Sequence, residues 1–164
     1  MTDPKHNVLF VCTGNSARSI LAEGILNHLN SDRFTAYSAG SSPKGAVHPM
    51  TLQTLRLLHI EDIGFHSKSW SEFAKEGAPF MDFVITVCDQ AAGEVCPVWP
   101  GQPITAHWGL ADPAAVEGSE EAQHRAFMDA AVTLKRRIEF MLSLPLAKLE
   151  KLALQRELRA IGAR

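Results

Sequence analysis

A strand, a loop and a helix are predicted in direct succession near the N-terminus, and they constrain the fold more than any other part of the chain. Residues 8–11 are all apolar, whereas Leu21, Ile25 and Leu29 recur at the spacing of one helix face. Cys12 and a short polar loop lie between these two patterns. A buried strand that turns at once into a helix is typical of a parallel α/β sheet.

The loop that begins at Cys12 is suited to bind an oxyanion. The first turn of a helix has N–H groups without partners and carries partial positive charge, and such an end binds phosphate-like anions. The same field favours thiolate over thiol, so we expect Cys12 to be a nucleophile at neutral pH. Arg18 can turn its planar guanidinium onto the anion. The predicted substrate-binding residues are Thr13, Gly14, Asn15, Ser16, Ala17, Arg18 and Ser19.

Several of these residue types suit a tight anion-binding turn. Gly14 allows close approach of the backbone, and Asn15 tolerates a left-handed conformation. Ser16 is the candidate N-cap of the helix, and Ser19 can donate a hydrogen bond to the Cys12 thiolate. The alternative is a buried cysteine at a strand end, next to an ordinary capped helix.

The rest of the chain continues the alternation of strands and helices. We expect strands at residues 8–11, 35–39, 83–87 and 104–107, and helices at residues 16–30, 49–58, 69–75 and 120–141. The fold prediction is an α/β class protein. It is a single three-layer domain over residues 1–144, with a four-stranded parallel sheet flanked by helices. The site is expected at the carboxyl ends of the strands.

Residues 145–164 are predicted to form a C-terminal amphipathic helical extension. Its apolar stripe consists of Leu146, Leu149, Leu152, Ala153, Leu158 and Ile161. Such a stripe packs either on its own domain or on a twin chain, so a homodimer through this helix is one expectation. A membrane is not expected as a partner, because the stripe has no large aromatic anchors.

Composition and charge limit the classes of partner and the cellular compartment that we expect for this chain. A net charge of −2 gives no reason to expect nucleic acid, and no apolar run is long enough to span a membrane. Residues 1–6 do not resemble a signal peptide, so we expect a cytoplasmic protein. Three cysteines favour reactive thiols over a disulfide framework, and their spacing predicts no metal site.

Cys88 and Cys96 flank a small polar loop that follows the strand at residues 83–87. A disulfide needs Cα atoms within about 7 Å, which a hinged loop can reach. The two thiols either fill space in the core or take part in redox chemistry. We favour the redox role, because an activated thiolate is expected at the neighbouring strand end.

Asp112 and Pro113 follow the last expected strand. A carboxylic acid at the edge of an anion site can protonate an oxygen that would otherwise leave poorly. The alternative is a plain Asp-Pro turn.

Residues 11–19 read Val-Cys-Thr-Gly-Asn-Ser-Ala-Arg-Ser and resemble the phosphate loop of the low-molecular-weight tyrosine phosphatase superfamily. More narrowly, they resemble its arsenate reductase branch. The stretch from Thr86 to Gly101, followed by His107-Trp108-Gly109, is similar to the same branch, in which two redox cysteines follow the third strand. The resemblance extends from Asn7 to Phe140 and implies the low-molecular-weight phosphatase fold.

This resemblance implies the reduction of arsenate to arsenite, for arsenic detoxification. Cys12 would attack arsenic while Asp112 protonates the departing oxygen. Cys88 would then attack the Cys12 sulfur, and Cys96 would attack Cys88. The catalytic residues are therefore expected to be Cys12, Arg18, Cys88, Cys96 and Asp112. Thioredoxin is the implied external reductant, with glutaredoxin as the alternative.

A phosphatase that hydrolyses phosphate monoesters through a Cys12 phosphoenzyme is the main rival, and a non-catalytic anion sensor is a second. The phosphatases of the superfamily usually have an aromatic residue after the Asp-Pro pair, where this chain has Ala114. No tightly bound cofactor is expected. Some family members hold a potassium ion at positions that match Asn15, Glu23 and Ser38, but a further acidic ligand is replaced here by Ser69.

Overall fold

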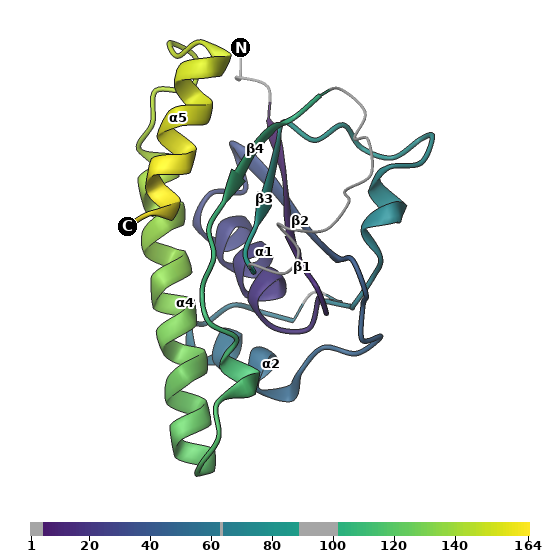
Figure 1. Ribbon diagram of the computed structural model, residues 1–164, viewed down its shortest axis with the longest axis vertical. Helices are drawn as coiled ribbons and strands as arrows, with labels where there is room; N and C mark the ends of the chain where they lie inside the picture. Colours follow the sequence, from purple (N-terminus) through teal and green to yellow (C-terminus); the bar gives the residue numbers. More distant parts are fainter. Residues whose placement is uncertain (1–4, 63, 89–101) are drawn as a thin grey trace.

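A four-stranded parallel sheet forms the centre of the protein, with the strand order β2-β1-β3-β4 (Figure 1). The computed structural model describes residues 5–62, 64–88 and 102–164. The strands are β1 (His6–Cys12), β2 (Phe34–Gly40), β3 (Phe83–Thr86) and β4 (Ile104–His107). The predicted sheet is confirmed. β1 and β2 are longer than expected because they pair in register along their whole length, from His6 opposite Phe34 to Cys12 opposite Gly40.

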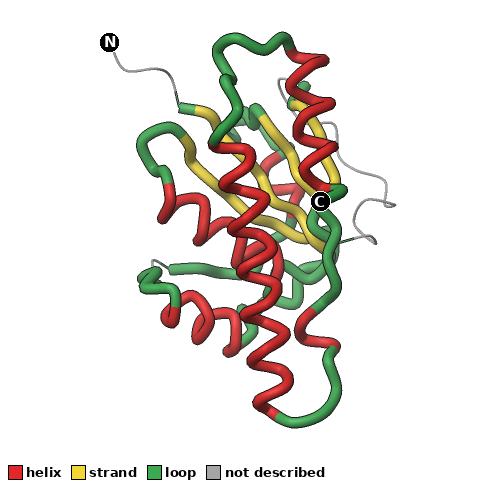
Figure 2. Tube along the Cα trace, turned by 90° about the vertical axis from the view of Figure 1, so that its left-hand side faces the viewer, coloured by secondary structure: helices red, strands yellow, loops and turns green. Residues whose placement is uncertain are grey.

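Helices surround this sheet. Figure 2 shows the strands enclosed among them. They are α1 (Arg18–Leu29), α2 (Pro49–Leu57), α4 (Glu120–Leu142) and α5 (Lys151–Gly162), with short 3-10 turns η1 (Trp70–Phe73) and η2 (Pro113–Ala115). α1 packs on β1 and β2 and lies beside α4, which also contacts α2. None of the helices in the described ranges is long and apolar enough to cross a lipid bilayer.

The apolar run of residues 8–11 forms the middle of β1. All four side chains are at most 1% exposed. Because successive side chains of a strand point to opposite faces, both faces of the sheet are covered at β1. Tyr37 of β2 also packs on Phe73 of η1, with ring centroids 5.5 Å apart.

The C-terminal helix packs on the same domain rather than standing apart. Leu154, Leu158 and Ile161 of α5 are buried, and α5 contacts β4. The predicted stripe is wrong at Leu152, which is 72% exposed. The helix begins only at Lys151, so the leucines before it do not share its register.

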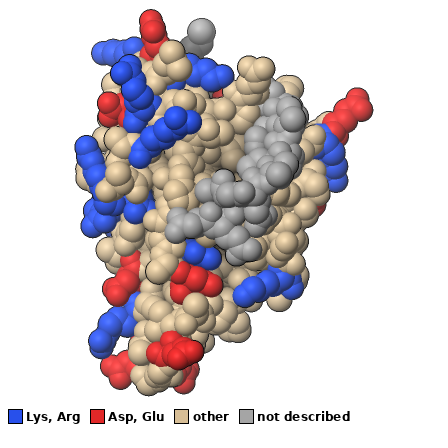
Figure 3. Space-filling view, in the orientation of Figure 1, with Lys and Arg blue, Asp and Glu red and all other residues tan. Residues whose placement is uncertain are grey.

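Close contacts hold α5 against the end of β4. The indole Nε1–H of Trp108 donates to the Leu158 carbonyl at 2.8 Å. A Cβ atom at Gly162 would lie 2.1 Å from the His107 carbonyl oxygen, so this approach requires glycine. Lys151 and Arg159 donate to backbone carbonyls at the edge of the sheet. Figure 3 shows Lys and Arg side chains gathered over this helix.

Candidate active site

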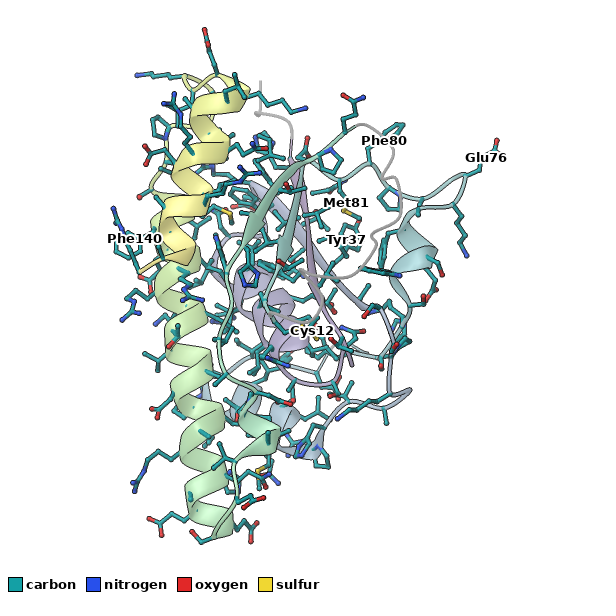
Figure 4. The ribbon with its side chains drawn as sticks, in the orientation of Figure 1. Cys12, Tyr37, Glu76, Phe80, Met81 and Phe140 are labelled. Carbon is teal, nitrogen blue, oxygen red and sulfur yellow. The ribbon has the colours of Figure 1, made fainter. Side chains whose placement is uncertain are left out.

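Cys12 ends the central strand β1, and its sulfur is held by the start of the segment that follows (Figure 4). The Asn15 amide N–H donates to Cys12 Sγ at 3.2 Å, and Ser19 Oγ lies 2.9 Å from the same sulfur. Asn15 has a φ of 45°, the left-handed conformation expected for this loop. The Cys12 side chain is only 3% exposed, so the thiol is a sheltered group at the end of the sheet.

The loop carbonyls are held by the segment that follows β2. Backbone and hydroxyl groups between residues 41 and 51 donate to the carbonyls of Cys12, Thr13, Gly14 and Ser16. Across the described part of the chain, the amide N–H groups of Gly14, Ser16 and Ala17 donate no hydrogen bond. These four carbonyls therefore have donors, while the amides of Gly14, Ser16 and Ala17 stay available, which is the arrangement that an anion requires.

The N-terminus of α1 has no side-chain cap. The expectation that Ser16 caps this helix is wrong, because α1 begins at Arg18 and its N-cap is Ala17, which makes no capping hydrogen bond. A side-chain cap would occupy N–H groups that an oxyanion could otherwise accept from. The missing cap thus leaves the helix end open to a ligand.

A pocket of about 240 Å³ opens above this loop. It is lined by Cys12, Thr13, Gly14, Ser16, Ala17, Arg18, Ser42, Lys44 and Asp112. Two of the predicted substrate-binding residues, Asn15 and Ser19, do not line it and are fully buried instead. Their contacts are with Cys12, so they support the thiol rather than the space above it.

Arg18 and Asp112 meet at this pocket although they are far apart in sequence. Arg18 Nη1 donates to the Leu110 carbonyl at 2.9 Å, and its Nη2 lies 3.9 Å from Asp112 Oδ2. The other carboxylate oxygen of Asp112 accepts from the Ala114 amide and caps η2. Asp112 therefore stabilises an Asp-Pro turn and also lines the anion pocket.

Lys44 lines the pocket but was not among the residues predicted from the sequence. Its amide donates to the Gly14 carbonyl at 2.9 Å, and its side-chain carbons lie 3.2 to 3.4 Å from where a Cβ at Gly14 would stand. Gly14 therefore leaves room for the lysine chain to lie across the loop. The available signal was the position of Lys44 in the loop after β2, since loops that follow neighbouring parallel strands meet at one edge.

Cys88 lies directly beside the loop. The Thr13 amide donates to Cys88 Sγ at 3.2 Å, and Thr13 Oγ1 lies 3.4 Å from the same sulfur. Cys12 and Cys88 are both free thiols, and Cys88 is 2% exposed. The structure thus brings Cys88 next to the residue that follows Cys12. Cys96 lies outside the described residues.

The predicted potassium positions, Asn15, Glu23 and Ser38, form a polar cluster with Lys68. Ser38 Oγ donates to the Glu23 carboxylate, and Lys68 Nζ donates to the Ser38 carbonyl at 2.9 Å. Burial raises the pKa of Glu23 and lowers the pKa of Lys68, and each group's charge opposes the other's shift. Among the residues that the structure describes, no three His, Cys, Asp or Glu side chains are grouped as metal ligands.

Comparisons with known proteins agree on one family. A family profile described as low molecular weight phosphotyrosine protein phosphatase matches residues 7–153. The chain is 33% identical over 135 residues to the arsenate reductase of Halalkalibacterium halodurans, covering 82% of this chain and 94% of that protein. A solved thioredoxin-dependent arsenate reductase of Corynebacterium glutamicum aligns with a TM-score of 0.62 and 27% identity, over 90% of this chain and 66% of that one. A solved arsenate reductase in its oxidized state aligns with a TM-score of 0.66 and 27% identity, over 81% of this chain and 93% of that one.

Proposed function

The chain belongs to the low-molecular-weight phosphotyrosine protein phosphatase family, and on this basis we propose that it reduces arsenate to arsenite. The observation that carries the proposal is the position of Cys88, whose sulfur accepts a hydrogen bond from the Thr13 amide. Hydrolysis of a phosphate ester needs one nucleophilic thiol, whereas reduction needs a second thiol within reach of the first. The similarity to proteins named arsenate reductase supports the same choice.

The pocket supplies what a tetrahedral oxyanion needs. Free amides of the loop and of the α1 N-terminus can donate to the anion, and the Arg18 guanidinium in the pocket lining can bind two of its oxygens. Asn15 Nδ2 donates to Ser19 Oγ at 2.8 Å. Because that bond uses the Ser19 oxygen as an acceptor, the Ser19 hydroxyl hydrogen is available for Cys12 Sγ, where it stabilises the thiolate.

The first chemical step forms a bond between Cys12 and arsenic. The Cys12 thiolate attacks arsenic, and one arsenic–oxygen bond breaks. Asp112 gives its proton to the departing hydroxyl group, which leaves as water. The 3.9 Å approach of Arg18 and Asp112 brings the acid and the oxyanion-binding cation to the same side of the pocket.

The second step transfers electrons from sulfur to arsenic. Cys88 attacks the Cys12 sulfur, the sulfur–arsenic bond breaks, and its electron pair stays on arsenic, which leaves as arsenite. The two thiols have then become a Cys12–Cys88 disulfide. Both sulfurs are nearly fully buried, so an external protein could not reach this bond.

Cys96 would then take over the oxidation from Cys12. It attacks Cys88 and forms a Cys88–Cys96 disulfide, which releases the Cys12 thiolate for the next cycle. A dithiol protein, thioredoxin or glutaredoxin, reduces that disulfide and becomes oxidised itself. This cycle requires a compartment that keeps thiols reduced, which is the cytoplasm.

A coupled assay tests the proposal. Purified protein, thioredoxin, thioredoxin reductase and NADPH are mixed, and arsenate is expected to cause consumption of NADPH. Mass spectrometry after one turnover without reductant should show Cys88 linked to Cys96 and Cys12 free. Rapid hydrolysis of an aryl phosphate, with no arsenate-dependent oxidation of thioredoxin or glutaredoxin, would establish the phosphatase instead.

Asp112→Asn should lower kcat by about 10²-fold to 10³-fold, because the amide cannot protonate the departing oxygen. An asparagine side chain can still accept from the Ala114 amide, so the η2 turn is kept. The measurement is kcat against pH. The exposed Asp129→Asn on α4 serves as the control and should leave kcat unchanged. An Asp112 variant with the wild-type kcat would exclude this residue as the acid.

Lys44→Ala should raise KM for arsenate about fivefold, the equivalent of ~1 kcal/mol, and leave kcat unchanged. Lys44 adds positive charge at the mouth of the pocket but is exposed, so its effect should shrink as salt increases. Steady-state kinetics at low and high ionic strength provide the check, with exposed Lys148→Ala as the matched control. A change confined to kcat would show that the lysine does more than attract the anion.

A further inference from the structure

The backbone N–H, the carbonyl and the ammonium of Lys68 all form hydrogen bonds with residues that support the anion loop. Its backbone N–H donates to Asn15 Oδ1 at 2.8 Å, and its carbonyl accepts from the Gly40 amide at 2.9 Å. Its side-chain Nζ donates to the Ser38 carbonyl at 2.9 Å. One residue thus joins the buried loop asparagine to the end of β2.

The Lys68 ammonium also faces a partly buried carboxylate. Glu23 accepts from the Ser38 hydroxyl, and Lys68 is one of the positive charges that act on it. Lys68 in turn is influenced by Glu23 and, more weakly, by Glu72. A pocket of about 460 Å³, lined by Glu23, Ser38 and Lys68 among others, opens this cluster to solvent.

The same positions are not open to a potassium ion while the Lys68 ammonium is present. An ion would have to lie among the oxygens of Asn15, Glu23 and Ser38, beside the ammonium that already binds the Ser38 carbonyl. The Asn15 oxygen accepts from the Lys68 amide, and the Ser38 carbonyl accepts from Lys68 Nζ. The Ser38 hydroxyl hydrogen is directed at Glu23. A resident cation, the ammonium itself, already lies among these groups.

We propose that the Lys68 ammonium acts as a built-in monovalent cation behind the anion loop, and that the enzyme therefore needs no potassium. Lys68 is a positioning residue, since it is absent from the anion pocket. Its hydrogen bond to Asn15 Oδ1 directs Asn15 Nδ2 toward Ser19, and Ser19 contacts Cys12 Sγ. The donor to Asn15 is the Lys68 backbone N–H, and the ammonium fixes the position of Lys68 itself by donating to the Ser38 carbonyl.

The first test compares salts. Arsenate reduction by the wild-type protein is measured in potassium chloride and in choline chloride at equal ionic strength, and the two rates should be equal. Lys68→Ala removes the ammonium and leaves Glu23 open to solvent. In choline chloride its kcat/KM should fall about tenfold, and potassium chloride should restore most of the loss. Exposed Lys75→Ala is the matched control and should respond to neither salt.

The second test does not depend on arsenate chemistry, although the mechanistic role of Lys68 rests on the proposed function. Alkylation of Cys12 by iodoacetamide at neutral pH is followed by mass spectrometry of the Cys12 peptide. Lys68→Ala should be alkylated more slowly than the wild type, and potassium should restore the rate. If arsenate reduction is absent but this pattern holds, only the proposed function fails.

Two results would overturn the proposal that the Lys68 ammonium acts as a built-in cation. One is stimulation of the wild-type protein by potassium. The other is a folded Lys68→Ala protein, verified by thermal unfolding, whose Cys12 alkylation equals that of the wild type. Should Lys68→Ala fail to fold, Lys68→Gln answers the same question, because it can still donate to the Ser38 carbonyl but carries no charge.

Discussion

Cys12→Ser is expected to abolish arsenate-dependent consumption of NADPH, with a loss of about 10⁴-fold or more. A serine hydroxyl is not ionised at neutral pH, and the groups that contact the Cys12 sulfur, the Asn15 amide and the Ser19 hydroxyl, are not bases. An oxygen at this position also cannot form the disulfide with Cys88 that releases arsenite. The coupled assay with thioredoxin measures the loss.

The Cys12→Ser protein should still bind the anion. The free loop amides and Arg18 are unchanged, and a serine hydroxyl can occupy the place of the thiol between Asn15 and Ser19. Phosphate should therefore raise its melting temperature about as much as it raises that of the wild type. Reductase activity that survives in this variant would remove Cys12 from the chemistry altogether.

Cys88→Ser should stop repeated arsenate reduction, so that its turnover rate falls to less than about one thousandth of the wild-type rate. Hydrolysis of an aryl phosphate should change less than about threefold, because that reaction needs only Cys12, Arg18 and Asp112. A serine hydroxyl can still accept the hydrogen bond from the Thr13 amide, so the loop keeps its support. Both activities are measured on one preparation.

The two activities of Cys88→Ser separate the competing functions. Loss of arsenate turnover with phosphatase activity intact supports the sulfur relay. Loss of both would mean that the loop has been disturbed, and circular dichroism with phosphate-induced stabilisation would detect it. If arsenate turnover continues, the electrons do not come from Cys88, and hydrolysis of phosphate esters becomes the better account.

Most of the fold could be predicted because its signals are local. The apolar run of β1, the helical spacing of α1 and the strand at residues 104–107 are each visible within a short window of sequence. The meeting of Cys12, Arg18 and Asp112 also followed from sequence, since parallel strands bring their carboxyl ends to one edge.

The features that were missed depend on tertiary contacts. The register of α5 is set by contacts of Leu158 and Gly162 with the end of β4, which leave Leu152 in solvent. Lys44 and Lys68 are ordinary polar residues in loops, and only the packing of those loops gives them a role. The boundary at residue 145 and the part played by Cys96 stay predictions.

The uncapped start of α1 means that the substrate completes the helix. Without an anion, the first turn lacks the acceptor that a capping side chain would provide. Inorganic phosphate has nearly the shape and charge of arsenate, so it should fill this gap and protect the protein against heat and proteolysis. In a cell the rate of arsenic removal would then follow the ratio of arsenate to phosphate rather than the arsenate concentration alone.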